Sequence, residues 1–212
     1  MPTTVAERAE QHPRRQRRRQ DAEREILAAA ERLLRTRPFR ELTVDDLMAA
    51  TTQSRTAFYR HFTDRHRLLI RLLEDVGEQL YAMADTWLSG SGDPAAEGRA
   101  ALERLADVYQ AHGPLLRAAS EAAHHDGEVE QVYRRLVERF VVATSARIER
   151  DIAAGRIRVP DARQAATALV WMNERYLAIA LDESSTTDRA TALDTLATIW
   201  IRSLYGSDPD IS

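Results

Sequence analysis

The 212-residue sequence contains no cysteine and no lysine, so all 30 of its basic residues are arginines. Without cysteine the chain can form neither a disulfide nor a catalytic thiolate, and this composition favours a cytoplasmic protein. No apolar run approaches the ~18 residues that a membrane helix needs, and the polar, then basic N-terminus does not resemble a signal peptide. We therefore expect no membrane partner, and the hydrophobic content of 44% predicts a folded core.

Motifs of catalysis are also missing. His124 and His125, followed by Asp126 and Glu128, could suggest a metal site. Zinc ligands on a helix normally stand three or four residues apart, and no two histidines of this chain have that spacing. The alternative is a solvated helix end. Because no phosphate-binding glycine motif and no nucleophile elbow is present either, the sequence predicts neither an enzyme nor a bound metal or cofactor.

Alternating strand patterns are absent, whereas apolar residues recur at helical spacing through most of the chain. Glycine and proline separate these segments, as at Gly113-Pro114. The predicted fold class is therefore all-α, with an N-terminal three-helix head and a C-terminal helical bundle. Besides two short helices within residues 43–62, helices are expected at residues 21–36, 65–89, 95–111, 114–124, 128–154, 161–182 and 188–205.

Charge is distributed unevenly along the chain. Residues 1–67 contain 15 arginines and 10 acidic residues, a net charge of +5, whereas residues 68–212 contain 15 arginines and 23 acidic residues, a net charge of −8. A basic head on an acidic body is typical of a DNA-binding domain joined to a part that does not bind DNA. We therefore divide the chain into an arginine-rich arm at 1–20, a DNA-binding domain at 21–66 and a helical body at 67–212.

The stretch from Thr43 to Phe62 is typical of two short helices joined by a tight turn, a helix–turn–helix. The hydroxyl of Thr43 can accept the backbone N–H of Asp46, three residues on, and so cap the first helix. Ser54 can cap the second helix in the same way. Phe58 and Phe62 stand four residues apart, so they share one helix face that can anchor the second helix to a core.

The remaining side chains of the second short helix point away from that face. They are Arg55, Thr56, Tyr59 and Arg60. In a DNA major groove, arginine pairs bidentately with guanine edges, the threonine methyl meets the thymine methyl and tyrosine reaches phosphate. The pattern therefore predicts a DNA-reading helix, and the alternative from this stretch alone is a solvated charged helix.

Arginine is concentrated just before the first predicted helix, where five arginines fall within seven residues and no apolar face accompanies them. Such a block repels itself and is expected to remain a flexible arm until it meets a polyanion. Beside a DNA-reading helix, binding to phosphates or to the minor groove is the favoured role, and a solubilising tail is the alternative. The arginines concerned are Arg14, Arg15, Arg17, Arg18 and Arg19.

These motifs are similar to those of TetR-type bacterial transcriptional repressors, and the resemblance covers nearly the whole chain. In the head it rests on Leu42-Thr43-Val44-Asp45-Asp46-Leu47, Ser54-Arg55, Phe58-Tyr59-Arg60-His61-Phe62 and Leu68-Leu69. In the C-terminal half the chain resembles the ethionamide-linked (EthR-like) branch of that family. This second resemblance rests on Ala168-Leu169, Met172-Asn173-Glu174-Arg175, Leu193-Asp194-Thr195-Leu196, Ile199-Trp200 and Leu204-Tyr205-Gly206.

The resemblance implies a homodimer that binds a near-palindromic double-stranded DNA operator and is released by a hydrophobic small-molecule effector. By analogy, residues 67–212 would be the ligand-binding and dimerisation domain, and the last two helices would form the dimer interface. The family's phosphate-binding positions correspond to Thr43, Tyr59, His61 and Arg65. The alternative is a DNA-binding regulator with a filled core and no effector.

The resemblance also implies an effector pocket in the body. Apolar side chains at helical spacing belong to a core more often than to a pocket, but Asn173 is more informative, because a buried amide needs a hydrogen-bond partner and a ligand could supply it. Asn173 could instead bond another helix, and Glu174 could pair with Arg175 of the partner subunit or with another arginine. The positions that match the pocket are Leu105, Tyr109, Tyr133, Leu136, Val137, Phe140, Thr144, Val170, Asn173, Glu174 and Trp200.

The sequence departs from the family pattern at four positions. Thr52 stands in the turn where the family usually has glycine, and Gln53 stands where a valine or isoleucine packs inward. Ala57 replaces a threonine or serine, so one expected phosphate-binding hydroxyl is missing. Val170 stands where the relatives carry a second asparagine, which predicts a less polar pocket.

Overall fold

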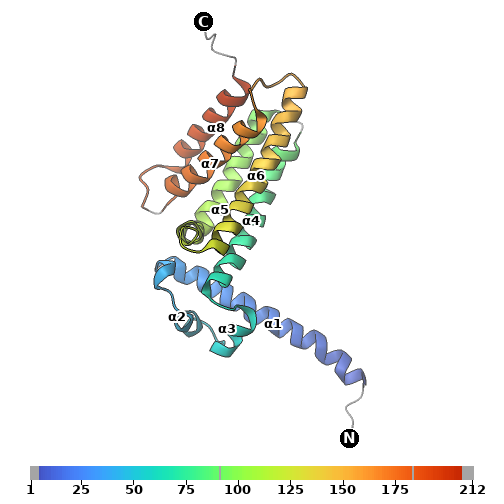
Figure 1. Ribbon diagram of the computed structural model, residues 1–212, viewed down its shortest axis with the longest axis vertical. Coiled ribbons are helices and arrows are strands. Elements are labelled where there is room, and N and C mark those ends of the chain that lie inside the picture. Colours follow the sequence, from blue (N-terminus) through green and yellow to red (C-terminus); the bar gives the residue numbers. More distant parts are fainter. Residues whose placement is uncertain (1–4, 91, 183, 207–212) are drawn as a thin grey trace. The chain divides into compact units, whose positions relative to one another are not determined.

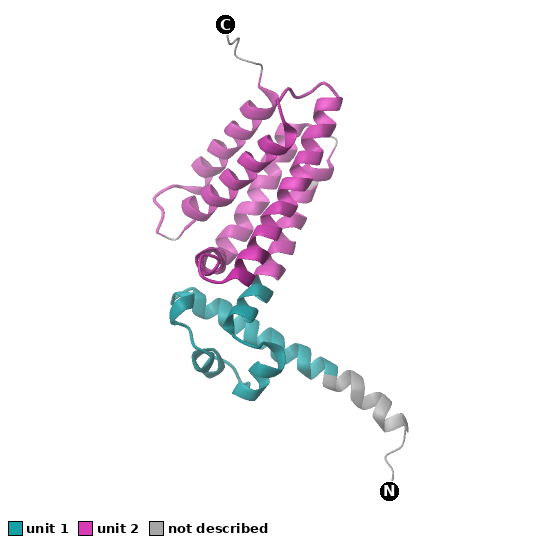
Figure 2. Cartoon of the chain, viewed as in Figure 1, with its two compact units in different colours: residues 1–72 teal, residues 73–212 magenta. Residues whose placement is uncertain are grey.

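The computed structural model describes residues 5–90, 92–182 and 184–206, with side chains from Gln16 onward except that of Thr86. The chain divides into two compact units, Met1–Leu72 (unit 1) and Leu73–Ser212 (unit 2), which Figure 2 shows in different colours. All the regular elements in the described ranges are helices, which confirms the predicted all-α fold. None of the helices in these ranges is long and apolar enough to cross a bilayer.

Unit 1 contains α1 (Val5–Leu34), the short 3-10 helix η1 (Phe39–Glu41), α2 (Val44–Ala49), α3 (Arg55–His61) and the beginning of α4 (Arg65–Ser89). The helices α2 and α3 form the predicted helix–turn–helix, and both contact α1 (Figure 1). Phe58 and Phe62 are buried as expected, so the apolar face of α3 is turned to the core of unit 1.

The predicted caps of the short helices are confirmed. The hydroxyl of Thr43 accepts the backbone N–H of Asp46 at 3.1 Å, and the Asp46 carboxylate accepts the backbone N–H of Thr43 at 2.9 Å, which completes a capping box. The hydroxyl and backbone N–H of Thr43, together with Arg37, lower the pKa of Asp46 to about 2. Ser54 caps α3 by accepting the N–H of Ala57 at 3.2 Å. These two caps fix where α2 and α3, the predicted DNA-reading helix, begin.

A flexible arm was predicted at 1–20, but from Val5 onward this segment is helical. It forms the first part of α1, which runs without a break to Leu34. Arginine, glutamine, glutamate and alanine, which make up most of this segment, are among the residues with the highest helix propensity. The arginine block therefore extends a helix that the apolar stripe of residues 21–34 already stabilises.

Unit 2 contains the rest of α4 together with α5 (Pro94–Ala122), α6 (Gly127–Ala153), α7 (Ala162–Ala180) and α8 (Arg189–Tyr205) (Figure 1). Each of the last four helices begins directly after an aspartate whose carboxylate accepts N–H groups of the first turn. Within the bundle, α6 packs against α7, and α5 packs against α8. The capping aspartates are Asp93, Asp126, Asp161 and Asp188.

The interruption predicted between helices at 95–111 and 114–124 is confirmed, since α5 consists of two helical segments joined at a kink between these ranges. The backbone leaves helical geometry at His112, with φ −120° and ψ 15°. Pro114 explains the kink, because proline has no N–H to donate and its ring collides with the carbonyl one turn earlier. The helix resumes at once because the residues after Pro114 pack into the core of unit 2, including Leu115 and Ala119.

Candidate functional site

Helix α3 presents its predicted DNA-reading side chains to solvent. Arg55, Thr56 and Arg60 are exposed, and the ring of Tyr59 is 50% exposed although it is aromatic. The Nη1 atom of Arg55 donates to both carboxylate oxygens of Asp45, at 2.7 and 3.0 Å, and its guanidinium lies 5.8 Å from the centre of the Tyr59 ring. The Arg55 guanidinium is thus held on the exposed side of α3. The Asp45 carboxylate accepts the N–H groups that a base edge or a phosphate could accept in a complex with DNA.

The turn between α2 and α3 is held by Glu25, which lies on α1. One oxygen of its carboxylate accepts the backbone N–H of Thr52 at 2.5 Å, and the other accepts the Thr52 hydroxyl at 3.0 Å and Nε2 of Gln53 at 2.6 Å. These donors, the Thr52 N–H foremost, lower the pKa of Glu25. Arg32, two helical turns further on, donates to the carbonyl of Ala50 at 3.2 Å.

This network explains two of the departures from the family pattern. No non-glycine residue in the described ranges has a positive φ, so the glycine-free turn adopts ordinary backbone angles. The polar side chains of Thr52 and Gln53 bond to α1 where an apolar residue would pack inward. Side chains of α1 therefore take over the role of shaping the turn.

We expect Glu25→Ala to loosen this turn, because three hydrogen bonds to one carboxylate are lost together. The amide proton of Thr52 should exchange with solvent several-fold faster, and Glu25→Gln, which keeps an acceptor oxygen, should lie between the two. Hydrogen exchange followed by NMR measures this directly. Asp21→Ala on the same helix is the matched control, since its carboxylate pairs only with Arg24 on the surface. Equal exchange in all variants would contradict the assigned role of Glu25.

Two predicted phosphate-binding residues have other partners. The His61 side chain is only 3% exposed, with Nδ1 3.6 Å from a carboxylate oxygen of Glu23. The Nη1 atom of Arg65 donates to the carbonyls of Phe39, Arg40 and Leu42 at 3.1, 3.0 and 2.7 Å. Each is turned into unit 1 in this structure, so a phosphate contact from His61 or Arg65 stays a prediction that requires the side chain to leave these partners.

The other predicted DNA contacts remain on the surface. Thr43 is exposed, although its hydroxyl also donates to Asp46 at 2.6 Å. Arg17, Arg18 and Arg19 are exposed, and Nη2 of Arg19 lies 3.5 Å from the carbonyl of Arg60 at the end of α3. The side chains of Arg14 and Arg15 lie outside the described residues.

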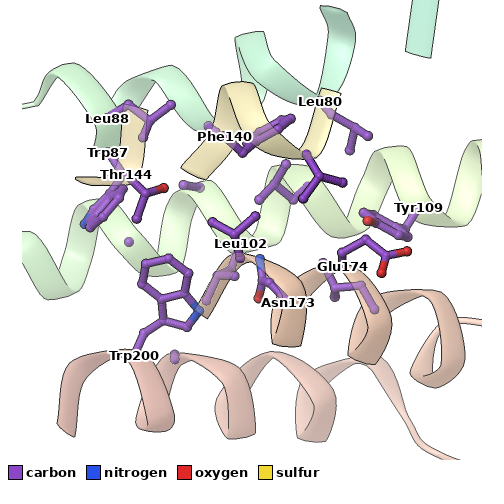
Figure 3. A pocket seen from close by; sticks show the side chains of 18 of the residues that line it. Leu80, Trp87, Leu88, Leu102, Tyr109, Phe140, Thr144, Asn173, Glu174 and Trp200 are labelled. Atoms are coloured by element: carbon purple, nitrogen blue, oxygen red, sulfur yellow. The ribbon is translucent and has the colours of Figure 1, made fainter. Parts of the chain in front are cut away.

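Unit 2 contains an apolar cavity of about 130 Å³ that is lined by side chains from α4 to α8 (Figure 3). A single buried water needs a cavity of roughly 10–15 Å³, so this space is several times larger than the site of one water. All eleven residues that match the family's pocket line this cavity. Sequence reasoning missed further lining residues, which include Leu73, Leu80, Trp87 and Leu88 on α4, Leu102 on α5 and Tyr205 on α8.

Polar atoms without hydrogen-bond partners gather in the wall of this cavity. Five buried side-chain atoms in the described ranges lack such a partner, and three of them belong to cavity residues: Oδ1 of Asn173, Oε2 of Glu174 and Nε1 of Trp200. The Trp200 ring packs edge-on against that of Trp87, with centres 5.3 Å apart. An unpaired buried polar atom costs about 1–3 kcal/mol, so a molecule that supplied partners here would gain that energy.

The partners of Glu174 answer part of the question that the sequence left open. Its Oε1 accepts the hydroxyl of Tyr133, and Nε of Arg175 in the same chain lies 3.8 Å from Oε2, beyond hydrogen-bonding distance. Burial and the Glu174 carboxylate raise the pKa of Tyr133 and of Tyr109, so both phenols are neutral donors at physiological pH.

A buried charge cluster, which sequence reasoning missed, lies at the end of α4. Arg147 of α6 is 1% exposed, and its Nη1 donates to the carbonyls of Trp87 and Gly90, the latter at 2.8 Å. Its Nε donates to Oδ2 of Asp151 at 3.1 Å, and Tyr205 donates to the same oxygen at 2.6 Å. The cluster thus ties α4, α6 and α8 together beside the cavity. The only signal in the sequence is an arginine–aspartate pair four residues apart.

Helices α7 and α8 carry large apolar side chains that are exposed to solvent. Trp171 and Ile179 on α7 are 38% and 62% exposed, and Ile199 on α8 is 37% exposed. Trp171 and Ile179 stand eight residues apart, so they lie on one side of α7. Exposed aromatic and branched side chains grouped on neighbouring helices are typical of a protein interface.

Comparison with known proteins fits this arrangement. Residues 26–72 match the family described as bacterial regulatory proteins, tetR family, and residues 98–206 match the C-terminal domain of the transcriptional regulator EthR. The chain belongs to the TetR family. This TetR-family protein is 34% identical to the HTH-type transcriptional regulator EthR of Mycobacterium tuberculosis H37Rv. The alignment extends over 193 residues and covers 89% of each chain. The protein is 33% identical to EthR of Mycolicibacterium smegmatis, over 89% of this chain and 88% of that one.

Solved TetR-family structures share the fold. A regulator from Syntrophomonas wolfei superposes with a TM-score of 0.72 at 16% identity, over 86% of this chain and 94% of that one. A regulator from Haloarcula marismortui gives a TM-score of 0.72 at 21% identity, over 87% and 99% of the two chains. The matched family and the EthR relatives are transcriptional regulators, and this TetR-family protein is a transcriptional regulator too.

Proposed function

We propose that this TetR-family protein is a repressor that binds a near-palindromic double-stranded DNA operator as a homodimer and leaves it when a hydrophobic molecule occupies the cavity. The observation that carries this proposal is the apolar cavity of unit 2, whose wall holds three buried polar atoms without partners. The alternative is a regulator with a filled core. Such a protein would be expected to have neither an open apolar cavity nor unpaired polar atoms in its wall. The protein would act in the cytoplasm, where bacterial operators lie.

The exposed face of α3 supports major-groove binding. Arg55, Thr56, Tyr59 and Arg60 all lie on the surface of a short helix whose caps and turn are rigidly held. A recognition helix of this kind reads base edges while neighbouring groups hold phosphates. With His61 and Arg65 occupied inside unit 1, the candidates for phosphate contacts are Thr43, Tyr59 and the exposed arginines of α1.

The exposed apolar side chains of α7 and α8 support a homodimer. A second copy of the chain, related by a two-fold axis, would cover Trp171, Ile179 and Ile199 with the same surface of its own. Two heads could then read half-sites about 34–36 Å apart, or a longer operator-specific distance. Sedimentation equilibrium tests this point, since a monomer at micromolar concentration would contradict it.

Helix α4 supports control by a ligand. It contributes residues 65–72 to unit 1 and residues 73–89 to unit 2, where Leu73, Leu80 and Trp87 line the cavity. A molecule that moved these residues would act on a helix continuous with the DNA-binding unit. To change operator occupancy from nearly full to nearly empty, it must prefer the non-binding state by roughly 10⁴-fold.

A two-stage experiment tests the proposal. Fragments of the source genome are first selected for binding, and lipophilic compounds are then screened for raising the melting temperature, because a ligand that binds only the folded state stabilises it. The compounds that stabilise should release the selected DNA. Trp200→Ala should abolish or alter this response without changing affinity for DNA. If no fragment binds at low ionic strength the DNA-binding part fails, and if no compound stabilises the protein the effector part fails.

Deleting residues 1–19 should weaken binding to any DNA sequence and flatten its dependence on salt. Each phosphate contact that is lost should lower the slope of log K against log salt by about 0.9 for duplex DNA. Titrations at several salt concentrations measure the slope, with the full-length chain as reference. An unchanged slope would mean that the arginines of this segment only keep the protein soluble.

A further inference from the structure

We propose that the cavity selects lipophilic molecules carrying a protonated amine or another strong N–H donor, and that Glu174 is the residue that recognises this group. The inference rests on the proposed effector function and specifies the chemistry of the ligand. It starts from the one acidic side chain among the residues that line the cavity.

Glu174 combines burial with incomplete bonding. Its Oε1 accepts the Tyr133 hydroxyl, whereas its Oε2 is buried without a hydrogen-bond donor. Figure 3 shows the Glu174 side chain rising from its helix toward Tyr109, at one end of the cavity. A buried carboxylate oxygen without a donor is costly, and the bond it lacks is the strong, charge-assisted kind.

The charges around the cavity favour a cation over an anion. Arg99, the one basic residue among the lining residues, lies half-exposed and donates to Asp194 at 2.7 Å and to Glu103 at 3.3 Å. Its charge is therefore already balanced by two carboxylates. Arg175 is the other cation close to Glu174, with Nε 3.8 Å from Oε2, and its side chain is 55% exposed to solvent. Solvent screens that pair, so the carboxylate keeps the capacity to attract a donor inside the apolar wall.

The other residues of the cavity wall determine what the rest of the ligand must be. Leucines, Val137, Phe140 and two tryptophan rings surround most of the space, so the body of the ligand must be apolar. A fatty acid would bring its carboxylate next to that of Glu174, and this like-charge contact is unfavourable in a poorly solvated site. A neutral alcohol would lack the charge-assisted bond. The expected order of affinity is therefore amine, then alcohol, then carboxylate.

Three probes with the same apolar part, a phenyl ring on four methylenes, test this order at neutral pH: 4-phenylbutylamine, 4-phenylbutanol and 5-phenylpentanoate. Trp87 and Trp200 lie in the cavity wall, so their fluorescence should report binding, with the melting temperature as a second readout. We expect the amine to bind about tenfold or more tightly than the alcohol, a difference of about 1.4 kcal/mol. In Glu174→Gln the amine should lose that advantage, while the affinity for the alcohol stays the same.

Two further variants complete the design. Glu130→Gln, on the exposed side of α6 and paired there with Arg134, is the control for a lost carboxylate and should leave the order unchanged. Tyr133→Phe removes the donor to Oε1 but keeps the charge of Glu174, so the preference for the amine should persist. The ranking of the probes by the native protein needs no variant, which keeps the inference testable if Glu174→Gln does not fold.

The outcomes separate this inference from the function on which it rests. If the alcohol or the carboxylate binds the native protein as tightly as the amine, selection by Glu174 is overturned, while the proposed effector cavity stands. If the amine keeps its full advantage in Glu174→Gln, the assignment to this residue is overturned. If none of the three probes binds, while other lipophilic compounds raise the melting temperature, only the amine preference fails. If no lipophilic compound binds, the effector function fails as well.

Discussion

Replacing Asp151 with alanine is expected to lower the free energy of unfolding by about 3–5 kcal/mol, the cost of leaving a buried charge without its partner. Asp151 is fully buried, and its carboxylate accepts hydrogen bonds from Arg147, Arg156 and Tyr205. In the variant, the Arg147 guanidinium would stay buried with one remaining carboxylate, that of Glu97 at 3.4 Å. This longer contact and the carbonyls at the end of α4 would not replace the lost ion pair.

Urea unfolding followed by circular dichroism measures this loss. Glu138→Ala is the matched control on the same helix, because Glu138 pairs with Arg163 on the surface. An exposed pair of this kind contributes about 0–1 kcal/mol. A loss in Asp151→Ala no larger than that of the control would mean that solvent reaches the cluster.

The same carboxylate predicts a dependence on pH. Burial opposes the ionisation of Asp151, but bonds from Tyr205, Arg156 and Arg147 outweigh it and hold its pKa below the ordinary 3.8. A group with a lowered pKa in the folded state stabilises the protein above its unfolded pKa. This contribution should therefore be complete above about pH 4 and be lost as the pH falls further. Asp151→Ala should show a shallower loss of stability in acid than the native protein.

Replacing Arg55 with alanine is expected to weaken binding to the selected operator by about 1–3 kcal/mol and to relax the preference for one base pair. The reason is that Arg55 is the arginine of α3 whose guanidinium is already fixed, by two bonds to Asp45 and by the ring of Tyr59. A guanidinium held in place loses less side-chain freedom when it binds a guanine edge. Binding must nevertheless take it from the Asp45 carboxylate.

Fluorescence anisotropy with the operator and with scrambled DNA measures both parts of this prediction. Arg134→Ala removes a solvated arginine of α6 and should change neither affinity. Asp45→Asn should strengthen binding to both DNAs, because it removes a competing negative charge from the surface proposed to bind DNA. Unchanged operator affinity in Arg55→Ala would contradict the docking of α3 in the groove.

Helix boundaries were predictable because they depend on local chemistry. Thr43 and Ser54 cap their helices as expected, and the aspartates before α5 to α8 bond the N–H groups of the following turn. A cap needs only a short polar side chain a few residues from a free N–H, so sequence distance determines it. The kink in α5 was predictable for the same reason, because Pro114 has no N–H to donate and interrupts the helix between the two ranges expected from the sequence.

Side-chain direction was less predictable than helix position. Arg55 and Arg65 are both arginines at the start of a helix, yet Arg55 lies on the surface and Arg65 bonds three carbonyls around η1. The difference depends on carbonyls more than twenty residues away from Arg65 in the chain. In the same way, Arg147 and Asp151 have the spacing of a surface ion pair, and only tertiary packing buries them.

The residues of the cavity were predictable through the family resemblance and not through periodicity. Val137 and Phe140 have the helical spacing that core residues also have. Whether such side chains contact other side chains or line a cavity depends on tertiary packing, which spacing does not reveal. Asn173 was the exception, since an amide among apolar residues predicts either a partner or a ligand. Its Oδ1 has no protein partner in the structure.

The bonds from Glu25 to Thr52 and Gln53 have a consequence for protein engineering. The conformation of the loop before α3 depends on a carboxylate 27 residues upstream. A chimera that received only residues 43–62 in another regulator would carry the amino acids proposed to contact bases without the hydrogen bonds that hold the preceding turn. Transfer of DNA specificity should therefore succeed only when the donor segment also includes Glu25 and Arg32.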